Sequence, residues 1–257
     1  MATSEVLVAD AGGIRTVTLN RPDVLNAMTD AMREAIAEAV RDFDANDDLR
    51  VLVLTGAGRG FCSGADLSGK PAEAGRPKRP SPRFFWHLPF EETNKPTICA
   101  LNGAAAGGGL GLVLSCDLVI ASETARLHPA FVGLGLSPDN GVSQKLVARI
   151  GYPRALQFFL AGAPLTAPHA KEIGFVDEVV APGELMPRAM EVAATFANRP
   201  PVAVALTKRL LKEALTHDRS TGLILEEAAI ALARQTADAA EGAAAFRERR
   251  EPVWKGY

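Results

Sequence analysis

The amino-acid sequence predicts an α/β fold, because short apolar runs of strand length alternate with segments of helical periodicity. Residues 51–54 form such an apolar run, and a glycine-rich stretch follows it at once, which is typical of a buried strand that ends in a turn. Residues 29–46 instead carry apolar side chains at the spacing of an amphipathic helix. This order of strands, glycine turn and helix recurs over the first 180 residues, and beyond Pro182 only helical patterns follow.

The first predicted elements are a hairpin and a helix. Residues 5–8 and 14–19 alternate around an Ala-Gly-Gly turn, which indicates two paired strands. Thr29 is a suitable N-cap for a helix that runs to Asn46. The apolar stripe of this helix consists of Met32, Ala35, Ile36, Ala39, Val40 and Phe43.

Three buried strands follow, at residues 51–54, 96–101 and 118–121. The glycine-rich turn after the first of them leads to an expected helix start near Ala65. Between the other two, the glycines 107–109 precede an apolar run, which predicts the start of a buried helix. A further turn signal around Asp139 precedes a helix expected over residues 142–150.

The two glycine-rich segments together predict an oxyanion hole. Glycines leave backbone N–H groups unshielded, and a helix N-terminus adds partial positive charge. One N–H donor from each segment, converging on one point, would stabilise an oxygen that gains negative charge during a reaction. Each such donor is typically worth about 3 to 4 kcal/mol in the transition state.

The C-terminal part is expected to be helical, with segments at residues 184–198, 200–216, 221–236 and 238–249. We therefore divide the chain into a core, residues 1–195, and a helical C-terminal region, residues 196–257. The second region has too little apolar core of its own to fold comfortably alone. Phe246 and Trp254 are expected in an interface or in the core.

Composition argues against several classes of function. The 257 residues carry a formal net charge of −2, which gives no general electrostatic reason to bind nucleic acid or an anionic membrane. No apolar stretch approaches the roughly 18 residues that cross a bilayer, and the N-terminus does not resemble a signal peptide. Cys62, Cys99 and Cys116 are expected to be free thiols in a cytoplasmic protein. No histidine pair has metal-ligand spacing, so no metal site is expected.

Several motifs, in order and over nearly the whole chain, resemble the crotonase superfamily of enoyl-CoA hydratases and isomerases. They are Asn20-Arg-Pro22 with Asn26-Ala27, Gly60-Phe-Cys-Ser-Gly-Ala-Asp-Leu67, Asn94-Lys-Pro96, Asn102-Gly103, Ala106-Gly-Gly-Gly109, Cys116-Asp117 and Gly135-Leu-Ser-Pro-Asp139. The resemblance implies a spiral of strand–strand–helix turns with two roughly perpendicular sheets. It also implies a homotrimer built by the C-terminal helices, which often pairs into a hexamer.

The resemblance further implies an acyl-CoA thioester substrate whose carbonyl lies between the amides of Ala65 and Gly108. CoA is then part of the substrate, and no metal or redox cofactor is expected. Asp66 and Leu67 would lie along the adenine end of CoA. Side chains expected to line the acyl pocket are Phe131, Phe85 and Trp86, although the last two could equally pin a surface loop to the core.

The acid–base groups depart from the hydratases of that family. Their two catalytic carboxylates correspond here to Gly111 and Phe131, so the hydratase mechanism cannot be carried over. Asp139 matches the catalytic aspartate of several isomerases in the superfamily, and its apolar neighbours would raise its basicity. From the turn alone, Asp139 could instead be a helix N-cap.

The sequence therefore predicts an isomerase that moves the double bond of a 3-enoyl-CoA to position 2, with Asp139 as the acid and base. Two alternatives stay open at this point. One is a hydratase or acyl-CoA hydrolase in which Asp139, with the help of His128, activates water. The other is a non-catalytic protein that binds acyl-CoA through the same oxyanion hole.

Overall fold

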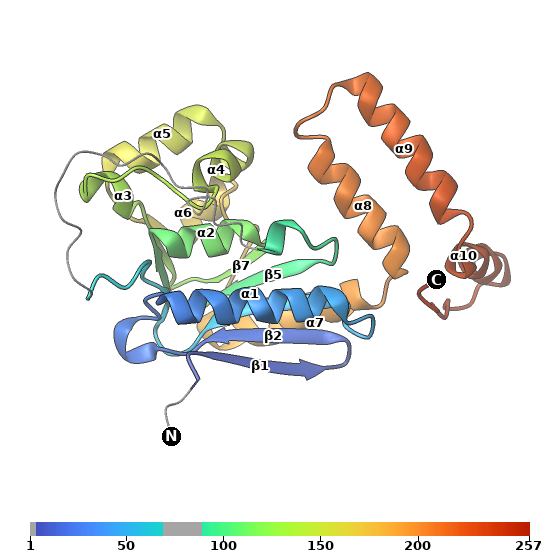
Figure 1. Cartoon of the computed structure of the whole chain (residues 1–257), viewed down its shortest axis with the longest axis horizontal. Helices are drawn as coiled ribbons and strands as arrows, with labels where there is room; N and C mark the ends of the chain where they lie inside the picture. Colours follow the sequence, from blue (N-terminus) through green and yellow to red (C-terminus); the bar gives the residue numbers. More distant parts are fainter. Residues whose placement is uncertain (1–3, 69–88) are drawn as a thin grey trace.

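The strands form two mixed sheets in the computed structural model, which describes residues 4–68 and 89–257 (Figure 1). The larger sheet has the order β1 (Val6–Ala11), β2 (Ile14–Leu19), β3 (Val51–Gly56), β5 (Thr97–Leu101), β7 (Leu118–Ser122) and β10 (Glu178–Val180). Its first pair is antiparallel, as the predicted hairpin requires, and all later pairs are parallel. The smaller sheet has the order β4 (Gly60–Cys62), β6 (Ala104–Ala106), β8 (Arg126–His128) and β9 (Leu165–Thr166).

Ten α-helices occur in the described residues: α1 (Asp30–Ala45), α2 (Gly108–Ser115), α3 (Ala130–Gly133), α4 (Val142–Ile150), α5 (Tyr152–Ala161), α6 (Ala167–Glu172), α7 (Leu185–Ala197), α8 (Pro201–Glu213), α9 (Arg219–Ala233) and α10 (Ala237–Glu248). Their positions confirm the predicted helices of the N-terminal and C-terminal parts. The α/β class predicted from the alternation of patterns is therefore confirmed.

Helices α1 and α7 cover the larger sheet, and the residues of β3 show how. Leu52 and Leu54 belong to the same buried cluster as the apolar stripe of α1. The intervening Val51 and Val53 belong to the second cluster, which contains the buried face of α7. Because side chains alternate between the two faces of a strand, β3 is buried on both sides, as its continuous apolar run predicts. Thr29 caps α1 as expected, since its hydroxyl accepts a 2.9 Å hydrogen bond from the Met32 amide.

The expected helix start near Ala65 is wrong. Ala65 forms an isolated parallel bridge with Met28, just before α1. The Met28 amide donates to the Gly64 carbonyl, and the Asp66 amide donates to the Met28 carbonyl. These bonds fix the backbone around Ala65 in an extended conformation, so no helix begins there.

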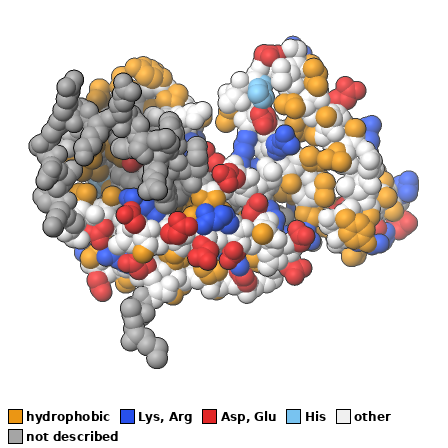
Figure 2. Space-filling view, viewed as in Figure 1, with side chains coloured by type: hydrophobic (Ala, Val, Ile, Leu, Met, Phe, Trp, Pro, Cys, Tyr) orange, Lys and Arg blue, Asp and Glu red, His pale blue; other side chains and the backbone are white. Residues whose placement is uncertain are grey.

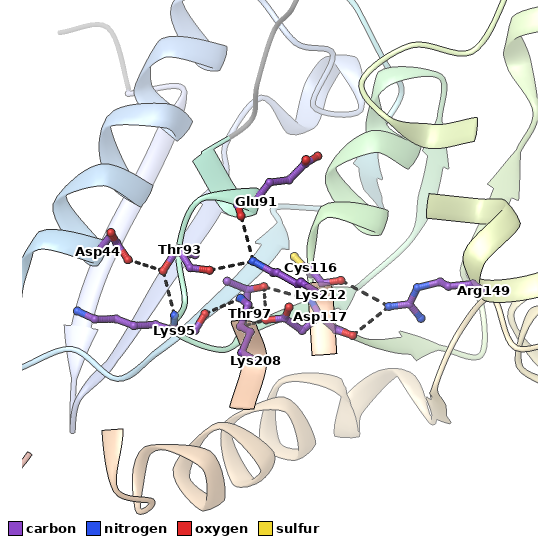
Figure 3. A network of polar contacts seen from close by, with 10 residues as sticks. All are labelled: Asp44, Glu91, Thr93, Lys95, Thr97, Cys116, Asp117, Arg149, Lys208 and Lys212. Carbon is purple, nitrogen blue, oxygen red and sulfur yellow. Dashed lines mark hydrogen bonds and ion pairs between the residues drawn. The ribbon is translucent and has the colours of Figure 1, made fainter. Parts of the chain in front are cut away.

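The C-terminal helices α8 and α9 form a hairpin that stands away from the sheets (Figure 1). Neither helix has a fully buried residue. Two lysines of α8 instead fix it to the core (Figure 3). Lys208 donates to the Lys95 carbonyl at 2.7 Å and to the Asp117 carboxylate at 2.6 Å. Lys212 donates at 3.0 Å to the backbone carbonyls of Glu91 and Thr93, in the segment that precedes β5.

Hydrophobic side chains lie exposed along this hairpin and on the neighbouring α10 (Figure 2). The exposed apolar residues of the region include Leu211, Leu215, Leu223, Ile224, Ile230, Leu232 and Phe246. Phe246 is 85% exposed, which excludes the core of its own chain, so its expected place in an interface stays a prediction. Trp254 is half-buried, and its indole donates to the Asn198 carbonyl at 3.3 Å.

Candidate active site

The two segments predicted to form an oxyanion hole lie against each other. A Cβ placed on Gly64 would lie 3.0 Å from the Ala106 carbonyl oxygen and 3.5 Å from the Gly108 amide nitrogen. The backbone before Ala65 therefore packs directly on the backbone at the N-terminus of α2. Glycine is required for this approach, and the φ of +99° at Gly64 adds a second reason for it.

The amides of Ala65 and Gly108 have no hydrogen-bond acceptor among the described residues. In the bridge with Met28, the Gly64 carbonyl and the Asp66 amide make the hydrogen bonds, and the Ala65 amide makes none. Gly108 is the first residue of α2, where N–H groups have no partner within the helix and the helix dipole is positive. Both groups are thus available to an electronegative atom, as an oxyanion hole would need.

Two glycines keep the start of α2 in this place. A Cβ on Gly108 would lie 2.7 Å from the Met28 methyl group. A Cβ on Gly109 would lie only 2.3 Å from the Cys62 carbonyl oxygen, in β4. Since that oxygen belongs to the backbone of a strand, it cannot rotate away, and only glycine allows α2 to approach β4 so closely.

Asp139 lies on the loop between α3 and α4, and it is not the N-cap of α4. The N-cap is Gly141, and no side chain caps the helix there. Asp139 contributes only its backbone carbonyl, which accepts from the Val142 amide at 3.0 Å. The alternative that Asp139 serves as a helix cap is therefore wrong, and its carboxyl group needs another explanation.

The surroundings of Asp139 favour its protonated form. Although the residue is exposed, protein atoms around the carboxyl group displace part of its water and raise its pKa above the ordinary value. The Arg33 guanidinium of α1 acts in the opposite direction, as does a hydrogen bond from Asn140. A carboxyl group with a raised pKa is a stronger base once ionised, which suits proton transfer.

Neither position of the two hydratase carboxylates carries one. Gly111 faces the side chain of Asn140, and a Cβ on Gly111 would lie 2.9 Å from the Asn140 Cβ. Phe131 is only 5% exposed and packs edge-on against Phe159, with ring centroids 6.2 Å apart. Its predicted contact with an acyl group stays a prediction.

Asp66 and Leu67, expected along the CoA adenine, follow the Ala65 amide directly. The Asp66 carboxylate accepts a hydrogen bond from the Ser68 amide and forms a 2.9 Å ion pair with Arg21. These bonds to Ser68 and Arg21 lower the pKa of Asp66 to about 2. Leu67 is 74% exposed and free to contact a ligand. Phe85 and Trp86 lie outside the described residues.

Two residues of this region were not singled out as site residues from the sequence. Arg21 joins the Asp66 carboxylate to the Ala27 carbonyl and to Glu5, so it ties the segment of Ala65 to the start of the chain. The signal was present, because Arg21 belongs to the Asn20-Arg-Pro22 motif. Asn140 was missed for another reason: the sequence of a turn does not show that its side chain contacts Gly111, which lies in α2.

Within residues 4–68 and 89–257, no group of three or more His, Cys, Asp or Glu side chains is placed to hold a metal ion. The same residues contain no helix with the length and apolar character needed to span a bilayer. All three cysteines are buried and unpaired.

Known proteins match this chain along nearly its whole length. The family described as enoyl-CoA hydratase/isomerase matches residues 9–257. The chain is 38% identical to the 1,2-epoxyphenylacetyl-CoA isomerase of Escherichia coli, over 95% of each chain. It is 33% identical to the short-chain-enoyl-CoA hydratase of Clostridium acetobutylicum, over 98% of this chain and 97% of that one. The crystal structure of an enoyl-CoA hydratase from Bacillus anthracis superimposes with a TM-score of 0.89 at 32% identity, over 99% of this chain and all of that one.

Proposed function

Because the chain belongs to the enoyl-CoA hydratase/isomerase family, we propose that it is an isomerase that moves the double bond of a 3-enoyl-CoA to position 2. Membership in the family makes it an enzyme that acts on acyl-CoA. Its relatives are named for both reactions, so the choice between isomerase and hydratase depends on this chain's own residues.

One observation carries the choice. Asp139 is a carboxyl group with a raised pKa, its neighbour Asn140 lies against the first turns of α2, and the two positions of the hydratase carboxylates hold Gly111 and Phe131. Hydration as the family performs it needs two carboxylates, one to position water and one to deliver a proton. A double-bond shift needs a single acid–base group, which Asp139 supplies.

In the proposed reaction, the Asp139 carboxylate takes a proton from C2 of the substrate. The electron pair of that C–H bond moves into the thioester, whose oxygen becomes negative in a dienolate. The amides of Ala65 and Gly108 stabilise this oxygen with two hydrogen bonds. Protonated Asp139 then returns its proton to C4, which leaves the double bond between C2 and C3. The substrate gains and loses one proton, so its mass does not change, and the proposed steps need no metal or redox cofactor.

The substrate is proposed to lie across the junction of the two donor segments. Asp66 and Leu67 adjoin the Ala65 donor and would contact the adenine end of CoA, and Phe131 would border the acyl chain. We place the enzyme in the cytoplasm, in keeping with its three free thiols.

We also propose that the protein is a homotrimer, or a hexamer made of two trimers, with the α8–α9 hairpin in the contact. An open groove of about 660 Å³ between α8 and the core supports this, since it is mostly apolar and includes Phe196, Leu211 and Leu215. Burial of these exposed leucines would stabilise an assembly, because apolar surface is removed from water.

The test is to supply a 3-enoyl-CoA and a 2-enoyl-CoA separately to the wild-type protein and to the Asp139→Asn variant, and to resolve the products by mass and chromatography. The proposal expects the 3-enoyl ester to isomerise without a change in mass, and the variant to lose this activity. Addition of water to the 2-enoyl ester as the main reaction would favour the hydratase instead. Binding of both esters without any reaction would favour the non-catalytic protein.

A further inference from the structure

The side chain of Asn140 lies between Asp139 and the N-terminal turn of α2. Its amide nitrogen donates to the Asp139 Oδ1 atom at 3.0 Å. The same nitrogen lies 3.6 Å from the place of a Cβ on Gly108, the proposed oxyanion donor. Its Cβ lies 2.9 Å from the place of a Cβ on Gly111. One side chain thus contacts the proposed base and the helix that carries the proposed donor.

The backbone of Asn140 has a φ of +51°, in the left-handed region that few L-residues adopt. Asparagine tolerates this conformation better than most residues, but glycine meets it without a steric cost. The backbone alone therefore does not explain an asparagine here. What distinguishes it from glycine is the carboxamide and the contacts that this group makes.

We propose that Asn140 is the positioning residue of Asp139, and that position 111 is a glycine because the Asn140 side chain occupies the space above it. This inference rests on the proposed function, since it assigns a partner to the proposed acid–base group. The hydrogen bond fixes the orientation of the carboxyl group through Oδ1, and Oδ2 of Asp139 takes and returns the proton in this proposal. A carboxylate from position 111, as hydratases carry, would collide with Asn140.

The charged groups around this loop come from three elements. Arg33 of α1 acts on Asp139 from one side. Glu91 and Lys145, from η3 (Pro89–Glu91) and from α4, form an ion pair beside Gly141. Asn140 is the neutral member of the group, and it donates a hydrogen bond to the ionised carboxylate, which stabilises that form. Its removal should therefore move the acidic limb of the activity profile to higher pH.

The experiment is a double-mutant cycle of Asn140→Gly and Gly111→Ala in the full-length protein, with isomerisation of a 3-enoyl-CoA as the assay. Asn140→Gly keeps the backbone conformation and removes only the side chain. We expect kcat to fall by about tenfold to a hundredfold, because the base loses its orientation. KM should change by less than about threefold, since substrate binding does not involve this group.

Gly111→Ala should lower kcat to a similar extent, because the new methyl group displaces Asn140. The double variant should be no slower than Asn140→Gly alone, since without the carboxamide the methyl group has room. Such non-additivity measures the coupling between the two residues. Gly135→Ala is the control: it strains the same loop at a φ of +71° but has nothing within 4 Å.

Three results would overturn the inference. The first is wild-type kcat and an unshifted pH profile in Asn140→Gly, with thermal unfolding unchanged. The second is additivity of the two substitutions in the double variant. The third is an equal loss of kcat in Gly135→Ala, because distortion of the loop would then explain the effect. Failure of the proposed function itself is read separately, from full activity of Asp139→Asn, and that result would remove both proposals together.

Discussion

Replacement of Gly109 by alanine tests whether the close contact of α2 with β4 holds the proposed oxyanion donor in place. The new Cβ would lie 2.3 Å from the Cys62 carbonyl oxygen, whereas real Cβ atoms essentially never approach nearer than 3.0 Å. The two backbones must therefore separate by at least the difference, about 0.7 Å. Because Gly108 precedes this residue directly, its amide should move by a similar amount.

Both stability and catalysis should respond to Gly109→Ala. Overpacking of a core typically costs about 1 to 3 kcal/mol, and we expect the upper half of that range because the obstacle is a backbone atom. Displacement of one donor should lower kcat by about a hundredfold, as loss of an oxyanion-hole donor does. Urea unfolding measures the first quantity, and steady-state isomerisation of a 3-enoyl-CoA measures the second.

The matched control is Gly133→Ala in α3, where a Cβ would meet nothing within 4 Å. Its free energy of unfolding should stay equal to the wild-type value or rise slightly, since alanine favours a helix by about 1 kcal/mol over glycine. If Gly109→Ala unfolds at the wild-type urea concentration and keeps its kcat, the contact between α2 and β4 does not position the donor, and the reasoning is refuted.

Three further predictions concern pH, capping and assembly. Because the pKa of Asp139 is raised, the folded state binds this proton more tightly than the unfolded state; the resulting stabilisation is present below the ordinary carboxyl pKa and is lost as pH rises through the folded-state pKa. Asp139→Asn should therefore be more stable than the wild type at neutral pH but not in acid. Urea unfolding at several pH values measures this difference. Thr29→Ala should lower the free energy of unfolding by about 1 kcal/mol, because the hydrogen bond from the Met32 amide to the Thr29 hydroxyl is lost, whereas Thr29→Ser should lower it less. Equal free energies of unfolding for the two variants would exclude a capping role. Leu211→Asp should dissociate the proposed oligomer in sedimentation analysis, and Val8→Asp on β1, also partly exposed, should not; an unchanged assembly in both would move the interface elsewhere.

Local patterns were enough to predict most of the fold. The stripe of α1 and the cap at Thr29 depend on residues within one helix, and the apolar run of β3 depends on burial alone. The helix expected near Ala65 failed because its backbone pairs with Met28, 37 residues earlier in the chain. Such a pairing depends on the tertiary structure, and no local signal contains it.

The candidate active site was likewise predictable only where its features depend on neighbouring residues in the sequence. The glycines of α2 were visible in the sequence because a cluster of them before an apolar run is unusual and has a physical reason. The partners of the side chains were not visible. Asp66 pairs with Arg21, 45 residues away, and Asn140 packs on Gly111, so both contacts arise only when separate elements meet.

The central claim is that Asp139 carries a proton from C2 to C4 of an enoyl-CoA. Its most direct test supplies a 3-enoyl-CoA that carries deuterium at C2 to the wild type and to Asp139→Asn in H2O, and locates the label by mass spectrometry and NMR. The account predicts deuterium at C4 of the product with the wild type, because Asp139 returns the atom that it removes from C2. It predicts no such transfer with the variant, although the variant still binds the ester. Transfer at the wild-type rate in the folded variant would contradict the account, because another group would then be the base.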